Sequence, residues 1–209
     1  MEVLGFLFRW SHVLFGITWI GMLYYFNFIQ GGYFKQASPE GLSDAKAKLA
    51  PSALWWFRWG AMGTFLTGVV MLFTIPTAMN NYIWIGAAFG TLMFLNVWMI
   101  IWPNQQIALG MKEGDAPAAG AKALLASRHN VLFSAPMVLC MLASPGHSGL
   151  SSYAPLDWSA TSMIVMLAII ALLELNALKG KQGPLTTVKG VIHSSLALTA
   201  VMVAVLTFL

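Results

Sequence analysis

Long apolar runs alternate with short polar stretches along the whole chain. A helix needs about 20 mostly apolar residues to cross the hydrocarbon core of a bilayer. The segments of that length, which we predict to be transmembrane helices, are residues 4–29, 54–76, 82–102, 126–144, 157–178 and 187–208. The pattern therefore predicts an all-α fold: a polytopic membrane helix bundle of about six transmembrane helices, forming a single integral membrane domain over residues 1–209.

The fourth segment is the least apolar, because Arg128 and His129 stand near its start. Ahead of it, the stretch GDAPAAGAKALL offers Asp115 as a helix N-cap and Pro117 in the first helical turn. We therefore expect this helix to begin there, before the apolar run itself.

The composition supports a membrane protein and argues against several other classes. Charged residues make up 9% of the chain, whereas soluble proteins carry about 25%. The net charge of +4 does not indicate nucleic-acid binding, because the basic residues are scattered over short loops. The first apolar run has no basic stretch before it and no small-residue cleavage site, so we expect a retained helix. The lone cysteine, Cys140, excludes an intrachain disulfide and is predicted to be buried.

The basic residues predict how the bundle is oriented. Of the 11 Lys and Arg residues, all except Arg9 belong to the first, third and fifth loops or their edges. They are Lys35, Lys46, Lys48, Arg58, Lys112, Lys122, Arg128, Lys179, Lys181 and Lys189. Cytoplasmic loops carry the excess of Lys and Arg. These loops are therefore predicted to be cytoplasmic, and both termini are predicted to lie outside.

The four histidines sort by depth into two pairs. His12 lies about two turns into the first helix from the outer face, and His147 follows the fourth helix at that same face. His129 opens the spanning part of the fourth helix at the inner face. His193 lies ~6 Å deeper than Lys189 in the last helix, again on the inner side. Neutral imidazole is an axial ligand of haem iron, so each pair is predicted to bind a b-type haem, giving one or two haems.

Arginines and small residues near these histidines fit the same hypothesis. Arg9 is one helical turn from His12, and Arg128 adjoins His129, so both are predicted to hold haem propionates. The small residues that would admit a porphyrin plane are Gly16, Gly190 and Ala197. Each histidine also has an ordinary explanation, since a helix-borne histidine often forms a hydrogen bond across a bundle.

Other polar residues within the apolar segments are expected to bond inside the bundle or to serve a cofactor. Glu174 is the one acid well inside a predicted helix, and it either pairs with Arg128 or handles protons beside an inner cofactor. Asn27, Asn96 and Asn176 are predicted to form hydrogen bonds between helices.

Polar and turn residues recur with the apolar background in four segments, RWSHVLFGITWIGMLYYFNF, WWFRWGAMGTFLTGVVML, GTLMFLNVWMIIWPNQQIAL and SRHNVLFSAPMVLCMLASPGH. In this order they resemble the membrane domain of the bacterial membrane-bound urate oxidase (urate hydroxylase) family over about residues 7–148. The polar and turn positions that carry the resemblance are Arg9, His12, residues 56–64 and 96–105, Arg128, His129, Asn130, Pro136, Met141 and His147. The last two helices, with His193, lie outside the part of the chain over which this resemblance is drawn.

The resemblance implies a multi-pass protein of the bacterial inner (cell) membrane with a redox function. Members of that family carry a cytochrome c after the membrane helices, whereas this chain has no CxxCH motif. The resemblance therefore implies a short form that works with a separate cytochrome c or other membrane subunits. The R-x-x-H motif of Arg9 and His12 is also similar to that of small haem-binding membrane protoporphyrinogen oxidases.

Two functions from different classes follow. The first is a membrane redox protein that binds haem b and passes electrons to or from a separate carrier, as a urate oxidase-like oxidoreductase. A purine substrate would find its partners in Asn104, Gln105, Gln106 and Arg58, which otherwise only decorate a helix end. The second is a non-catalytic subunit of a larger respiratory-type membrane complex, with its histidines used for packing.

The orientation can be tested directly. A reporter enzyme that is active only outside the cytoplasm, fused after Leu209, is expected to be active, because the basic loops keep the other side of the bundle in the cytoplasm. The same reporter inserted near Lys112 should be silent. Activity of a cytoplasm-only reporter at Leu209 would rule the orientation out.

Overall fold

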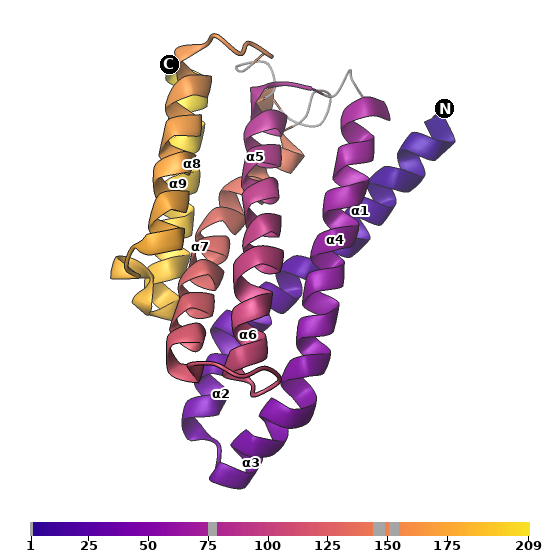
Figure 1. The fold of residues 1–209 in the computed structure, drawn as a ribbon. Coiled ribbons are helices and arrows are strands. Elements are labelled where there is room, and N and C mark those ends of the chain that lie inside the picture. The colour runs from indigo at the N-terminus through magenta and orange to yellow at the C-terminus, as the bar shows by residue number, and fades with distance from the viewer. Residues whose placement is uncertain (1, 75–78, 144–148, 151–154) are drawn as a thin grey trace.

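The computed structural model describes residues 2–74, 79–143, 149–150 and 155–209 as a bundle of long helices (Figure 1). In chain order the helices are α1 (Glu2–Tyr24), the π-helical η1 (Tyr25–Gln30), α2 (Gly31–Gln36), α3 (Pro39–Asp44), the π-helical η2 (Ala45–Leu49), α4 (Ala50–Thr74), α5 (Asn81–Leu95), the π-helical η4 (Asn96–Ile101), α6 (Trp102–Ala108), α7 (Ala116–Leu142), α8 (Thr161–Lys179), the 3₁₀ turn η6 (Gly183–Thr186) and α9 (Val188–Phe208). No strand occurs in these described ranges. The predicted all-α class is confirmed.

Five helices are long and apolar enough to cross a membrane: Val3–Phe34, Asn81–Ala108, Ala116–Leu142, Thr161–Lys179 and Val188–Phe208. Five of the predicted segments therefore have helical counterparts of spanning length and composition. The second predicted segment falls on α4, which has 25 residues but is not among the five. Its first turns carry Arg58 and three tryptophans, Trp55, Trp56 and Trp59, which lower the mean hydropathy. A sixth crossing through α4 stays a prediction.

The start of α7 follows from its cap. The Asp115 side chain accepts a hydrogen bond from the backbone N–H of Ala118 at 3.0 Å, and a proline lies in the first turn. This satisfies one of the free N–H groups at a helix start. The prediction that the helix begins at Asp115, before the apolar run, is confirmed.

The chain passes up and down the bundle, and its two termini lie at the same end of the bundle but on opposite sides of it (Figure 1). The turns that join α1 to α4, α6 to α7 and α8 to α9 lie towards the opposite end, and these turns hold most of the lysines. This arrangement is the one that alternating basic loops require. Which end faces the cytoplasm stays a prediction.

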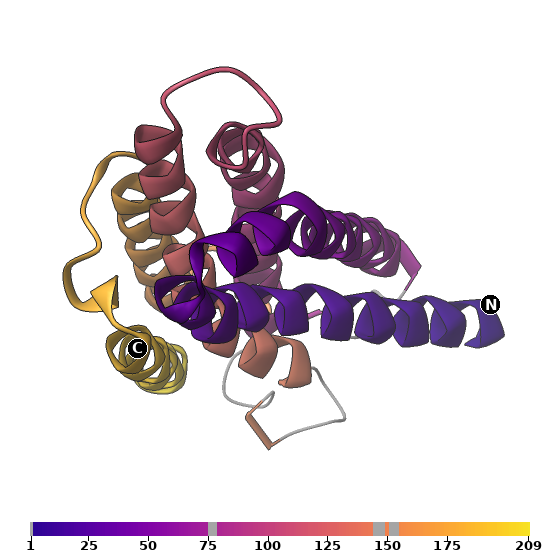
Figure 2. The ribbon, with the colours of Figure 1, turned by 90° about the horizontal axis from the view of Figure 1, so that it is seen from below.

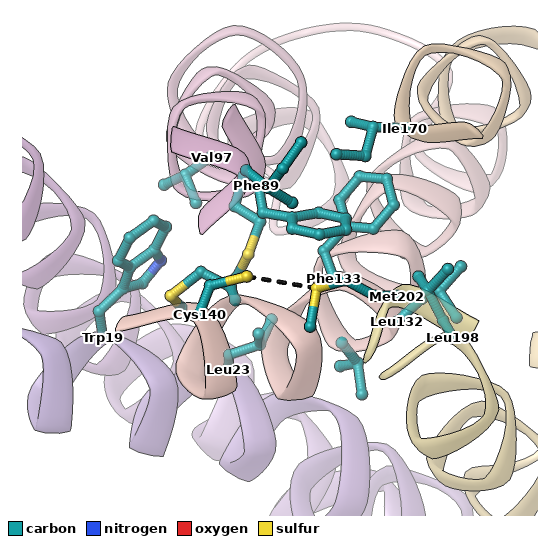
Figure 3. Packing of buried hydrophobic residues seen from close by; sticks show 14 of the residues in the cluster. Trp19, Leu23, Phe89, Val97, Leu132, Phe133, Cys140, Ile170, Leu198 and Met202 are labelled. Carbon is teal, nitrogen blue, oxygen red and sulfur yellow. Dashed lines mark hydrogen bonds between the residues drawn. The ribbon is translucent and has the colours of Figure 1, made fainter. Parts of the chain in front are cut away.

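Helix α7 lies at the centre of the bundle and packs against α5, α6, α8, α9 and the end of α1. Helix α1 leans away, so that its N-terminal half lies alongside α4 (Figure 2). The core fills the space where α5, α7 and α9 meet (Figure 3). There Phe89 and Phe133 lie 5.1 Å apart between ring centroids, and the Cys140 thiol donates to the Met202 sulfur at 3.2 Å. The predicted burial of Cys140 is confirmed.

Glycines allow two close contacts between helices. A Cβ placed on Gly86 of α5 would lie 2.6 Å from the Cβ of Cys140 in α7. A Cβ placed on Gly60 of α4 would lie 3.0 Å from the backbone nitrogen of Trp19 in α1. Small residues of this kind let membrane helices approach closely, where van der Waals contact rather than the hydrophobic effect holds them together.

The contact at Gly86 predicts a stability difference between two glycines one turn apart. Gly86→Ala should lower the free energy of unfolding by about 1–3 kcal/mol, because the methyl group forces α5 away from α7. Gly90→Ala should leave stability unchanged or raise it by up to about 1 kcal/mol, since its Cβ meets nothing within 4 Å and alanine favours the helix. Unfolding by denaturant in detergent, followed by circular dichroism, measures both. Equal stability of the two variants would contradict the close contact.

Candidate functional site

A cavity of about 320 Å³ lies between α1, α4, α5 and α7, in the half of the bundle that holds the termini. Its wall is mostly apolar and includes Trp19, Met137 and Met141. Two of the residues singled out from the sequence, Arg9 and His12, also line it. A concave, largely apolar space with a few convergent polar groups is the usual form of a cofactor or ligand site.

The hydrogen bonds around His12 fix its tautomer. The Thr67 hydroxyl donates to the carbonyl oxygen of Gly63 at 2.6 Å, which uses its one proton. The 3.1 Å contact between His12 Nδ1 and Thr67 Oγ1 is therefore donated by the imidazole. Nε2 is left with its lone pair, and it has no hydrogen-bond partner in the part of the chain that the structure describes. A histidine whose Nδ1–H is held in this way is prepared to bind a metal through Nε2.

The small residue beside His12 is Gly68 of α4. A Cβ on Gly68 would lie 3.1 Å from His12 Cε1, so glycine leaves room for the ring. Gly16, predicted from the sequence to make that room, does not line the cavity. The signal was missed because Gly68 belongs to another helix, and helical spacing relates only residues of the same helix.

Arg9 is exposed and lies at the edge of the His12 cavity. Its guanidinium forms no hydrogen bond or ion pair with any described residue. The structure thus brings Arg9 and His12 to one cavity, as their spacing predicts. His147, the predicted partner of His12, lies outside the described residues. Helix α7 ends at Leu142, which itself lines the cavity.

His129 is fully buried, and both of its ring nitrogens have partners. Nδ1 donates to the Leu125 carbonyl oxygen at 2.9 Å, so Nε2 is the acceptor and receives a hydrogen bond from the Asn176 amide at 2.8 Å. Asn176 is bonded in turn to the backbone of Lys181, just after α8. His129 therefore joins α7 to the end of α8.

His193 lies at a similar depth to His129 but points elsewhere. Two residues further along α9, Ser195 donates to the carbonyl oxygens of Val131 and Leu132 in α7, at 3.1 and 2.9 Å. These bonds place His193 near the level of His129. Its side chain is nevertheless exposed on the outer face of α9, while His129 is enclosed. The structure does not bring the two together as facing ligands.

Gly190 and Ala197, the small residues predicted to flank an inner haem, have other surroundings. A Cβ on Gly190 would collide with the carbonyl oxygen of Pro184, so glycine is needed to start α9. The Gly190 N–H also donates to the Thr187 hydroxyl, which caps this helix at 2.9 Å. Ala197 is exposed.

The predicted ion pair between Glu174 and Arg128 is wrong. Glu174 Oε2 accepts a hydrogen bond from the Asn96 amide at 3.2 Å, and Asn96 also donates to Asn130 Oδ1 at 3.0 Å. Among the described residues the one ion pair joins Lys48 to Asp44. Arg128 is buried, and its Nε and Nη1 have no hydrogen-bond partner in that same part of the chain.

The three predicted asparagine bonds are confirmed. Asn27 donates to the Ser127 hydroxyl at 2.8 Å, Asn96 bonds to Asn130, and Asn176 bonds to His129. Sequence reasoning did not identify the partners that complete this network: Ser127, Asn130, Ser134 and Ser195. Their signal is a polar residue on a buried face of an apolar helix, which shows only when the faces are known.

The residues proposed to bind a purine do not line the His12 cavity. The Arg58 guanidinium lies 3.8 Å from the centre of the Trp102 indole ring, in a cation–π arrangement. Asn104 donates to the carbonyl oxygen of Ile100 in its own helix at 2.7 Å. Gln105 and Gln106 are partly exposed at the end of α6. Within the described ranges, His, Cys, Asp and Glu side chains form no group of three that could hold a metal ion.

Fold and site together define, over the described residues, a helical bundle with five helices of membrane-spanning length and an apolar cavity that His12 lines near one end. The family model of the urate oxidase N-terminal domain matches residues 74–206, more than half of the 209 residues, and the chain belongs to this family. No curated protein and no solved structure matches the chain. The match includes α8 and most of α9, which lie outside the resemblance drawn from the sequence motifs, and it contains Arg128, His129 and His193. Residues 1–73, with Arg9 and His12, lie before it.

The bond between Asn176 and His129 predicts a structural effect. Asn176→Leu should lower the free energy of unfolding by about 1–3 kcal/mol, because the buried Nε2 of His129 loses its donor. His193→Leu, on the exposed face of α9, should change stability by less than about 0.5 kcal/mol. Denaturant unfolding in detergent measures both variants. If Asn176→Leu is as stable as the wild type, His129 has another partner.

Proposed function

We propose that this protein is a membrane redox protein related to urate oxidase, which holds haem b in the cavity between α1, α4, α5 and α7. Electrons would pass between this haem and a separate carrier, such as a cytochrome c or another subunit of the bacterial inner membrane. The observation that carries the proposal is the free Nε2 lone pair of His12 in the wall of an apolar cavity. The family match supports the relation to urate oxidase.

The residues of the cavity fit a haem. His12 would bind the iron through Nε2, and the Thr67 hydroxyl would hold the ring by accepting from Nδ1. Arg9, at the edge of the cavity, would pair with a propionate. Trp19, Met137 and Met141 would exclude water. A bound haem supplies one-electron chemistry whose potential depends on the axial ligands. His147, a few residues beyond the end of α7, stays the predicted second ligand.

The inner haem site receives less support. A histidine with both ring nitrogens engaged, as in His129, must lose a buried hydrogen bond before it can bind a metal. We therefore propose one haem, on His12, and assign His129 a structural role. Arg128 and His193 stay as sequence predictions for an inner site.

The hydrogen bonds between helices favour a second function. His129 and the asparagines bond to residues of neighbouring helices, as expected of a non-catalytic subunit in a larger membrane complex. In that case His12 would also only pack against α4. Urate oxidation is the activity that the family relation suggests, and Arg58 with its neighbour Trp102 is the cationic and aromatic group available for a purine.

A reduced-minus-oxidised spectrum of the purified protein separates the two functions. We expect a sharp b-type α band in the wild type, and its loss or displacement in His12→Ala, because the iron loses an axial nitrogen. His193→Ala removes an exposed imidazole and serves as the matched control with an unchanged band. His129→Ala should keep the band while losing about 1–3 kcal/mol of stability. A wild type without a band, or a His12→Ala variant with the wild-type band, rejects the haem and leaves the subunit function.

A further inference from the structure

A second hollow lies on the outer face of α5, between α5 and α8, and forms a groove of about 640 Å³. Its wall is almost wholly apolar. At the end nearest the chain termini, Trp84 and Trp158 meet with their ring centroids 4.9 Å apart. Towards the other end the groove contains one carboxylate, Glu174. An acidic side chain in an apolar groove of a membrane-spanning helix is costly and calls for a functional reason.

The Glu174 carboxylate is only half satisfied. Asn96 donates to Oε2 at 3.2 Å and holds the group in place from the bundle side. Oε1 has no hydrogen-bond partner among the described residues. Two more polar groups line the groove without a partner in that part of the chain: the Thr91 hydroxyl and the buried Nε1–H of Trp84. The groove therefore combines a long apolar wall with acceptor and donor positions that its own chain leaves open.

These features select one kind of occupant. Glu174 lies five residues before the end of α8 at Lys179, so ~8 Å inside the bundle along the helix axis. A phospholipid phosphate does not reach that depth and is repelled by the carboxylate, while an acyl chain has no hydrogen to donate. An uncharged aromatic head with hydroxyl groups and an apolar tail matches both the wall and the open acceptor.

The groove also adjoins the His12 cavity. Leu72 of α4 and Ala87 and Thr91 of α5 line both spaces. A molecule in the groove would thus be separated from the contents of the cavity by the thickness of these side chains. This proximity matters only for an occupant that exchanges electrons.

From the half-satisfied carboxylate and the shared wall, we infer that the α5–α8 groove binds a lipid-soluble quinol, with Glu174 Oε1 accepting a hydrogen bond from a ring hydroxyl. This rests on the proposed function, because it identifies the separate electron carrier as a quinol. The binding itself does not require the haem.

Binding can be measured with a decyl-chain benzoquinol and the full chain in phosphatidylcholine nanodiscs, by anaerobic titration calorimetry. The wild type should show one saturable site. Ala171→Phe fills the groove from α8 and should abolish the saturable heat, whereas Leu172→Phe, next to it but outside the groove, should bind as the wild type does. Ala88→Phe, which fills the groove from α5, provides a second blocking variant. Circular dichroism checks that each variant is folded.

Glu174→Gln separates the quinol from other lipids. The amide keeps the size of the side chain but removes the charged acceptor, so quinol affinity should fall by about tenfold or more. The oxidised benzoquinone has no hydroxyl to donate, and its affinity should not fall. Heat that is not saturable, equal binding by Ala171→Phe and Leu172→Phe, or competition by dodecanol as strong as by the quinol would each overturn the inference.

The two proposals fail independently. A wild type with the haem band and no saturable quinol binding rejects the quinol site alone. A wild type that binds quinol at the groove but shows no haem band rejects the haem alone. His12→Ala should leave the quinol affinity unchanged, because His12 does not line the groove.

Discussion

The structure depends on the need of buried polar side chains for hydrogen-bond partners in an interior without water. Helix α7 shows this most clearly. Ser127, His129 and Asn130 are all buried within about one turn, and successive helical residues point about 100° apart. Each therefore bonds to a different neighbour: Ser127 to Asn27 in η1, His129 to Asn176 in α8, and Asn130 to Asn96 in η4. One turn of one helix fixes the rotation of α7 against three others, and apolar contacts alone would specify that rotation less strictly.

The same need for hydrogen-bond partners distinguishes His12 from His129. In His12 and His129 alike, Nδ1 is held as a donor and Nε2 as an acceptor. His129 lies inside the network of α7, so an asparagine fills its acceptor. His12 lies on helix α1, where Thr67 of α4 bonds to Nδ1 and the ring lines the cavity between α1, α4, α5 and α7. A difference in helix packing, rather than in the residue itself, therefore makes one histidine structural and the other available to a ligand.

Features that depend on a single helix could be predicted from the sequence. Features that depend on how two helices pack could not. The apolar runs, the Asp115 cap and the burial of Cys140 follow from local pattern. Depth along a helix is also local, which is why His129 and His193 do lie near one level. The direction of a side chain around the helix axis requires the packing angle of its neighbours. For that reason the Glu174–Arg128 pair was wrong, and Gly68 of the facing helix was missed as the residue beside His12.

Helix α5 links the core, the His12 cavity and the groove. Its close contact with α7 at Gly86 forces the two helices together near the core. Gly90 and Thr91, one turn further on, line the His12 cavity. Thr91 also faces the groove on the other side, so that α5 forms a thin wall between the two hollows. Beyond that wall, Asn96 links Asn130 of the central network to Glu174 in the groove. The carboxylate is thus held by the bonds that set the rotation of α7, which gives this acid a fixed position in the groove.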